Sequence, residues 1–270
     1  MNYPTLRNFR RTLLAAVICV FCMGITARRG AAQFPGGGQA RPPLAPKAAA
    51  LIDVTGYWVS IVDEDWRWRM VTPPKGDYSS VPLNADGRKV ADTWDPAKDE
   101  AEGNQCKAYG AAGIMRVPTR LHITWADDST LKIETDAGMQ TRLLHFDGSK
   151  WQGGEPQWQG DSVASWDRAR QSRGFVPSFG PAPPGSGGSL KVITTHMKPG
   201  YYRKNGVPYS ANARMIEYFD RITDDDGTPY LILTSVVQDP QYLTDTFITS
   251  EQFKFEPNGA KWNPQACKAR

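Results

Sequence analysis

Apolar and charged side chains alternate along residues 56–70, with apolar residues at most even positions and ionic ones between them, as in the neighbours Trp68 and Arg69. Successive side chains of a β-strand point to opposite faces. The alternation therefore predicts one long strand with an aromatic face and an ionic face. We expect Asp65, Arg67 and Arg69 to form a surface ladder of ion pairs on the ionic face. Such a strand suits the wall of a β-barrel.

Short β patterns recur further along the chain and are separated by turn residues. They are rich in β-branched or aromatic residues and cover 120–125, 130–136, 139–146, 162–167, 190–197, 215–222, 230–238 and 246–256. Residues typical of hairpin turns stand at 126–129, 137–138 and 224–227. The pattern predicts a mainly β fold, an antiparallel barrel in which neighbouring strands follow one another in the chain.

Residues 83–101 depart from the β pattern. Val90, Ala91 and Trp94 are at helical spacing, and Asp95-Pro96 can end one helix and begin the next. We predict two short helices here, covering one end of the barrel.

Proline and glycine mark the segments that flank or interrupt this domain. Residues 33–50 are rich in Pro, Gly and Ala and predict a flexible leader, so the barrel domain spans 51–270. A long Pro/Gly insertion at 174–189 cannot form regular structure. It is either a lid or a surface loop, and we expect a surface loop.

The first 32 residues have the features of an export signal. A basic start with Arg7, Arg10 and Arg11 precedes an apolar run, and small residues stand before Gln33. No other apolar run is long enough to cross a bilayer, so we expect no integral membrane segment after cleavage and a periplasmic or secreted protein. The export signal holds five of the 32 basic residues and none of the 28 acidic ones, so the remainder is close to neutral. No basic patch remains to bind nucleic acid.

Cys106 and Cys267 are the cysteines that remain beyond the export signal. In an oxidising compartment, two distant cysteines are best explained as one disulfide. Two free thiols or an intermolecular bond are the alternatives.

The three histidines, His122, His145 and His196, each lie on a predicted strand. The sequence has no close-spaced pair of ligands, so we expect separate hydrogen-bonded histidines and no metal site. His196 or His122 is then a candidate general base. No phosphate-binding or dinucleotide-binding motif is present, and we expect no cofactor.

Aromatic and charged residues supply the candidate ligand contacts. The segment 199–210 contains an Asn-Gly turn with Tyr201 and Tyr202 before it. These phenols could bind a hydrophobic ligand at the barrel mouth, or the hairpin could simply be solvent-exposed, stabilised by tyrosine contacts across its strands.

Charges also interrupt two otherwise apolar strand faces. Glu217 and Arg221 are four residues apart and share a face, so they are expected to be exposed or paired, because an isolated buried carboxylate is very costly. A pair inside the barrel would make them functional candidates. Glu64 interrupts the aromatic face of the first strand in the same way, next to Trp66 and Trp68.

Several motifs resemble an uncharacterised family of secreted bacterial proteins. They are Pro-Leu-Asn-Ala-Asp-Gly at 82–87, Trp-Asp-Pro-Ala at 94–97, 158–166 with a tryptophan at each end, Gly-Val-Pro-Tyr-Ser at 206–210, Glu217 with Arg221, and Asp-Pro-Gln-Tyr at 239–242. Separately, Gly56-Tyr57-Trp58 resembles the entry motif of the lipocalin and wider calycin barrels. This second resemblance implies a calycin-like barrel. The domain departs from lipocalins in its length, its early helices and its Pro/Gly insertion.

These observations favour an exported barrel that binds a hydrophobic or aromatic small molecule. Trp66, Trp68, Tyr201 and Tyr202 would contact it, and Glu64, His196, Glu217 and Arg221 would orient its polar groups. One alternative is a cofactor-independent lyase, hydratase or isomerase acting on a terpenoid, steroid or phenolic substrate, with His196 or His122 as base and Glu217 or a tyrosine as acid. Another is a surface or assembly protein without a ligand.

Overall fold

The computed structural model describes residues 43–148, 154–168 and 187–270. Leu44–Arg270 form one compact unit. The predicted export signal, most of the predicted leader and most of the Pro/Gly insertion lie outside the described residues.

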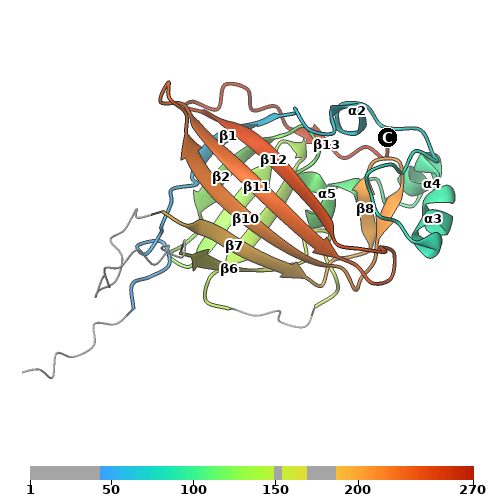
Figure 1. The fold of residues 1–270 in the computed structure, drawn as a ribbon, viewed down its shortest axis with the longest axis horizontal. Coiled ribbons are helices and arrows are strands. Elements are labelled where there is room, and N and C mark those ends of the chain that lie inside the picture. The colour runs from blue at the N-terminus through green and yellow to red at the C-terminus, as the bar shows by residue number, and fades with distance from the viewer. Residues whose placement is uncertain (1–42, 149–153, 169–186) are drawn as a thin grey trace, which may run out of the picture. The chain divides into compact units, whose positions relative to one another are not determined.

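Nine strands close into a barrel in the order β1-β12-β11-β10-β7-β6-β5-β3-β2 (Figure 1), so the predicted mainly β barrel is confirmed. The strands are β1 (Gly56–Ile61), β2 (Arg120–Trp125), β3 (Thr130–Thr135), β5 (Gln140–His145), β6 (Asp161–Asp167), β7 (Ser189–Thr195), β10 (Arg214–Thr223), β11 (Pro229–Gln238) and β12 (Phe247–Glu256). Each strand predicted downstream of residue 116 is present, with bounds within two residues of those expected.

The barrel departs from a purely antiparallel arrangement at one place among the described strands. β5 and β6 run parallel, and only Leu144 with Ser162 and His145 with Val163 are paired there. The other neighbouring strands of the barrel are antiparallel. β1 pairs with β12 on one side and β2 on the other, so the first and last long strands close the wall.

The short elements gather at one end of the barrel (Figure 1). The helices are α2 (Trp66–Arg69), α3 (Ala85–Asp92), α4 (Pro96–Ala101), the 3-10 turn η1 (Lys107–Tyr109) and α5 (Ala111–Ile114). Two small sheets accompany them, an antiparallel pair of β8 (Gly200–Arg203) with β9 (Val207–Tyr209) and a parallel pair of β4 (Ala137–Gly138) with β13 (Gln265–Ala266).

α3 and α4 confirm the two predicted helices, and both have side-chain caps. The Asn84 side chain accepts a hydrogen bond from the backbone N–H of Gly87. Asp95 caps α4 in the same way, and Pro96 occupies the first helical position, where its missing N–H costs nothing.

The prediction of one strand across residues 56–70 is wrong. β1 ends at Ile61, and α2 begins after Asp65, whose φ of 50° is in the left-handed region. This turn breaks the alternation, so Arg69 is not part of a surface ladder. Its side chain is buried, and its Nε donates to the carbonyl of Arg116 at 2.9 Å.

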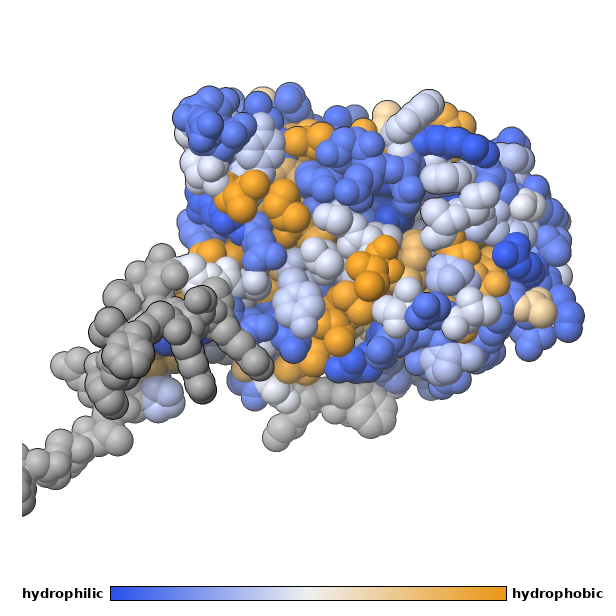
Figure 2. Space-filling view, in the orientation of Figure 1, coloured by the Kyte–Doolittle hydropathy of each residue, from blue (hydrophilic) through white to orange (hydrophobic). Residues whose placement is uncertain are grey.

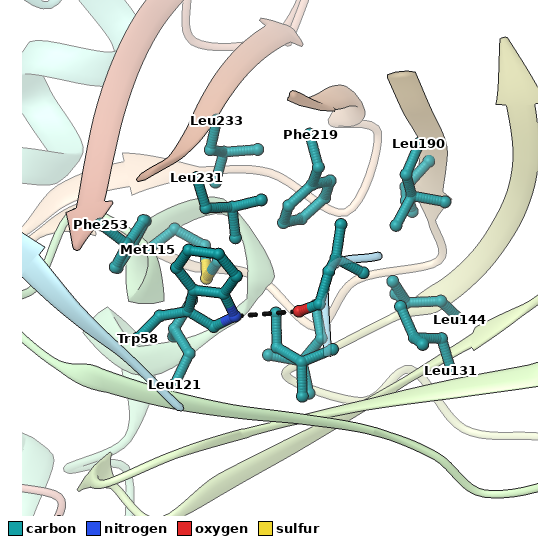
Figure 3. Packing of buried hydrophobic residues seen from close by; sticks show 14 of the residues in the cluster. Trp58, Met115, Leu121, Leu131, Leu144, Leu190, Phe219, Leu231, Leu233 and Phe253 are labelled. Atoms are coloured by element: carbon teal, nitrogen blue, oxygen red, sulfur yellow. Dashed lines mark hydrogen bonds between the residues drawn. The ribbon is translucent and has the colours of Figure 1, made fainter. Parts of the chain in front are cut away.

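Large apolar side chains from the strands pack together inside the barrel (Figure 3). Trp58, Phe219 and Phe253 have no exposed surface and belong to one cluster with leucines and isoleucines from the opposite strands. The Trp58 indole N–H donates to the carbonyl of Val54 at 2.9 Å, so its polar atom is satisfied. Each fully buried side chain of this size stabilises the fold by roughly 1.5–3 kcal/mol. α5 adds Ile114, which joins the same cluster at the helical end.

An ion pair lies among the buried side chains of the strands. Arg142 of β5 donates to both carboxylate oxygens of Glu217 of β10, at 2.9 and 2.6 Å, and both side chains are fully buried. Thr194 of β7 accepts from the same guanidinium and hydrogen bonds Ser162 at 2.8 Å. Glu217 is thus paired inside the barrel, but its partner is Arg142 and not Arg221.

The predicted disulfide is present between Cys106 and Cys267. It connects the start of η1 with the C-terminal residues that follow β13. The two cysteines are 161 positions apart in the sequence, so the bond closes a large loop and restricts the unfolded chain.

The outer surface is mixed in character. In Figure 2, apolar areas over the strands are separated by polar ones. Leu143, Val163 and Ile248 are among the exposed apolar side chains. Among the residues that the structure describes, no helix is both long and apolar enough to cross a lipid bilayer.

The buried pair generates a stability prediction. Replacing Glu217 by Ala leaves the Arg142 charge buried without its carboxylate, so the free energy of unfolding should fall by about 3–5 kcal/mol. The double variant Arg142→Met/Glu217→Leu removes both charges and should recover most of that loss. Urea unfolding followed by tryptophan fluorescence measures both. A loss below about 1 kcal/mol in Glu217→Ala would show that the pair is not buried as described.

Candidate functional site: a cationic cavity at the helical end of the barrel

A cavity of about 330 Å³ opens at the end of the barrel that carries the short elements. Its walls come from residues 68–72, from residues between 108 and 118, from 137–138, from 202–204 and from the C-terminal residues 265–268. The disulfide holds two of these walls together, because Cys106 precedes η1 and Cys267 lies within the C-terminal wall.

The break after β1 brings Trp68 to this cavity. The half-buried indole N–H donates to Asp77 at 3.2 Å, and the guanidinium carbons of Arg67 and Arg203 each lie 5.0 Å from the ring centre. Two cations thus lie close to the ring, and the negative face of an indole attracts such charges.

Three arginines with buried side chains line the same cavity: Arg69, Arg116 and Arg203. Arg116 is paired with two carboxylates, Glu251 at 2.9 Å and Asp65 at 2.6 Å. Burial raises the pKa of the Glu251 carboxyl above its usual value, although the positive charges of Arg116 and Arg69 act in the opposite direction. Arg69 has weaker partners, since its amino groups donate to the Glu64 carbonyl at 3.5 Å and to the Ser60 hydroxyl at 3.4 Å. Desolvation lowers the pKa of Arg69.

Arg203 is the least compensated of the three. Only 5% of the residue is exposed, and its Nη2 donates to the hydroxyl of Ser80. Its Nε and Nη1 are buried and have no hydrogen-bond partner among the described residues. Desolvation, with the nearby positive charge of Arg116, lowers the pKa of Arg203 to about 10. At neutral pH this side chain is a buried cation, and two of its donor nitrogens have no hydrogen-bond partner among the residues that the structure describes.

The charge balance of the cavity is positive. Lys204 and Lys268 join the arginines in its lining, and none of the described lining residues is acidic. The Lys204 ammonium lies 4.9 Å from the centre of the Tyr109 ring. Apolar surface is present too, from Val117 and Pro118 among others. The cavity therefore combines aromatic and apolar walls with excess positive charge.

The structure places the predicted ligand-binding residues in different surroundings. Trp68 and Tyr202 line the cavity. Tyr202 packs against Tyr209 and Phe247, and burial raises its pKa. Tyr201 is on the same strand, but its hydroxyl donates to Asp99 at 2.8 Å, and desolvation raises its pKa.

Three other predicted contact residues do not line this cavity. Glu64 and Trp66 are exposed, Trp66 by 64% of its surface. Arg221 donates to the carbonyl of Asp53 at 2.7 Å, near the start of β1 and away from the helical end. The alternation that grouped Glu64, Trp66 and Trp68 on one strand ends at the left-handed Asp65.

The histidines have separate surroundings. His122 stacks on Tyr57 with ring centres 4.1 Å apart and lies 3.3 Å from Glu134. His145 is 3.4 Å from the hydroxyl of Thr130. His196 lies just beyond β7, with a φ of 55°, and its Nδ1 is 2.9 Å from Asp161. The prediction that His196 lies on this strand is therefore wrong, because the left-handed residue lies beyond the regular alternation of β7.

None of these histidines lines the cationic cavity. His145 and Asp161 line a different cavity of about 360 Å³, next to the short parallel pairing of β5 and β6. Within the described ranges, no three His, Cys, Asp or Glu side chains are grouped so that they could hold a metal ion.

The arginine cluster is not predicted from the sequence. The pattern places Arg69 in a surface ladder and gives no role of their own to Arg203, within the tyrosine-rich segment, or to Arg116. Only the position of Arg203 directly after two tyrosines offered a signal, because aromatic and guanidinium groups together are typical of binding surfaces.

Comparisons of the chain with models of protein families, with curated proteins and with solved structures gave no match. The resemblances described from the sequence therefore stay predictions, and the case for a function depends on the cavity itself.

The uncompensated charge generates the next prediction. The pKa of Arg203 is lower in the folded protein than in the unfolded chain. Its positive charge therefore lowers the stability of the folded state at every pH below about 10. Arg203→Met keeps an unbranched chain against Trp68 and removes the charge, so the protein without ligand should become more stable by about 1–2 kcal/mol.

The matched control is Arg88→Met, which changes an exposed arginine of α3 and should alter stability by less than about 0.5 kcal/mol. Urea unfolding compares the two variants. A clear destabilisation by Arg203→Met would mean that its charge is compensated in the folded protein.

Proposed function

We propose that the protein is an exported barrel that binds a hydrophobic or aromatic small molecule in the cationic cavity at its helical end. The observation that carries this proposal is a cavity of about 330 Å³ whose lining includes Trp68, Tyr109 and Tyr202. Small-molecule sites are typically concave, of a few hundred Å³, and lined by aromatic groups with a small number of polar ones.

The location at the end of the barrel follows from the packing inside it. Trp58, Phe219 and Phe253 occupy the interior with no exposed surface, so these aromatic groups are already in contact with other side chains. Trp68 is only half-buried and is therefore available to a ligand. A disulfide beside the cavity suits an oxidising compartment, which supports export.

Binding is favoured over the enzymatic alternative by the side chains at the cavity. General acid–base catalysis needs a base within hydrogen-bonding reach of the substrate. His122 and His196 face Glu134 and Asp161, and Glu217 is occupied by Arg142. The cavity lining includes tryptophan and tyrosine rings, arginines and lysines, which suit recognition.

A neutral aromatic dye tests this proposal. N-phenyl-1-naphthylamine fluoresces more strongly in apolar surroundings, and we expect saturable binding of one molecule per chain. Trp68→Ala should weaken the affinity about tenfold, because it removes an aromatic wall. Trp66→Ala, which changes the exposed neighbouring tryptophan, should leave the affinity unchanged. Fluorescence titration measures all three proteins, and equal affinities for all of them, or no saturable binding, would contradict the proposal.

A further inference from the structure

We propose that the ligand of this cavity is an organic anion, an aromatic or otherwise flat apolar molecule with a carboxylate or similar oxyanion, and that Arg203 binds the anionic group. This inference depends on the proposed function, because it assigns a chemical class to the ligand of the same cavity. It goes beyond that function in requiring a negative charge on the ligand.

Arg203 has hydrogen-bond donors at the cavity that are unused in the described part of the chain. The residue lines the cavity and is almost fully buried, yet two of its nitrogen atoms have no partner among the described residues. A buried donor without a partner is costly. Nε–H and the Nη1 amino group lie on different edges of the guanidinium, so one carboxylate does not take both. An oxyanion accepts strong charge-assisted hydrogen bonds from a guanidinium, so an oxygen atom of a carboxylate would satisfy the unused Nη1.

The carboxylates near Arg203 form their salt bridges with other arginines. Asp65 and Glu251 both bond Arg116, and Asp77 bonds Arg67 at 2.7 Å. Asp65 and Asp77 lie close enough to favour the charge of Arg203 in part, but neither is within salt-bridge distance of it. The chain thus provides no direct counter-ion for this guanidinium within the part that the structure describes.

The charged side chains of the cavity lining together produce a positive electrostatic field. Arg69, Lys204 and Lys268 add positive charge to a lining that contains no acidic residue among those described. Cavity walls of low dielectric strengthen such a field and attract an anion. A cationic or neutral ligand would leave this charge uncompensated.

The surroundings of Arg203 favour a ligand with a flat apolar part next to its anionic group. The guanidinium carbon of Arg203 lies 5.0 Å from the centre of the Trp68 ring, so a flat apolar group near the indole comes close to the guanidinium. Val117 and Pro118 supply further apolar wall. These surfaces favour a ligand with both an apolar and an anionic part over a free inorganic ion.

The experiment uses two dyes that differ only by a charged group. 1-Anilinonaphthalene-8-sulfonate has the aromatic skeleton of N-phenyl-1-naphthylamine and carries one sulfonate in addition. We expect the wild-type protein to bind the sulfonate dye at least about tenfold more tightly than the neutral dye, with one molecule per chain. Isothermal titration calorimetry supplies both the affinity and the stoichiometry.

Variants at Arg203 identify the group responsible. Arg203→Gln should abolish the preference for the sulfonate dye, weakening the affinity for that dye at least about tenfold more than the affinity for the neutral dye. Arg203→Lys keeps the charge without the planar fork and should retain part of the preference. Arg88→Gln, the exposed control on α3, should behave as the wild type. Thermal unfolding of each variant verifies that it is folded.

The outcomes separate this inference from the proposed function. If neither dye binds with saturation, both are overturned. If both dyes bind equally, or if Arg203→Gln weakens them by the same factor, the cavity binds an aromatic molecule but the assignment of an anion to Arg203 is wrong. If millimolar inorganic phosphate displaces the sulfonate dye as well as benzoate does, the site recognises a free anion and the organic class is wrong.

Discussion

Packing of the inward-facing side chains is the constraint on which the rest of the structure depends. Nine strands direct their apolar residues to one interior, where rings such as Trp58 and Phe219 meet without exposed surface. Charges in such a place must be paired, and the bidentate contact between Arg142 and Glu217 satisfies that requirement. Charge that is not fully paired lies instead at the helical end of the barrel, where the cavity opens.

The helical end owes its character to three local features. Asp65, which lies between β1 and α2, has a left-handed backbone conformation, and the turn there places Trp68 and Arg69 at the cavity. The hairpin of β8 and β9 delivers Arg203, and Gly206 in its turn has a φ of 82° and packs against Trp94, where a side chain would not fit. The disulfide fixes the C-terminal wall. An uncompensated arginine in this place costs stability, a common feature of functional sites.

Local patterns predicted the fold well because they depend on neighbouring residues. The β2 pattern matched its strand at both ends, and Asp95-Pro96 predicted the start of α4, since capping is a property of adjacent positions. The functional residues were harder to predict. Glu217 has its partner 75 residues earlier in the chain, and only the order of the strands brings them together.

Backbone conformations outside the regular patterns caused the other differences. Alternation along 56–70 is typical of a strand, but it carries no information about a single positive φ at Asp65. The same is true of His196, which follows β7 with a positive φ and contacts Asp161. The cationic cavity is assembled from five separate segments, so no single stretch of sequence could reveal it.

The most direct test of the account is a crystal structure of the protein with 1-anilinonaphthalene-8-sulfonate bound. The account predicts the naphthalene ring beside Trp68 and the sulfonate in hydrogen-bonding contact with the guanidinium of Arg203. Electron density for the dye inside the barrel, between Trp58 and Phe219, would contradict it, because ligand binding would then depend on opening the packed interior.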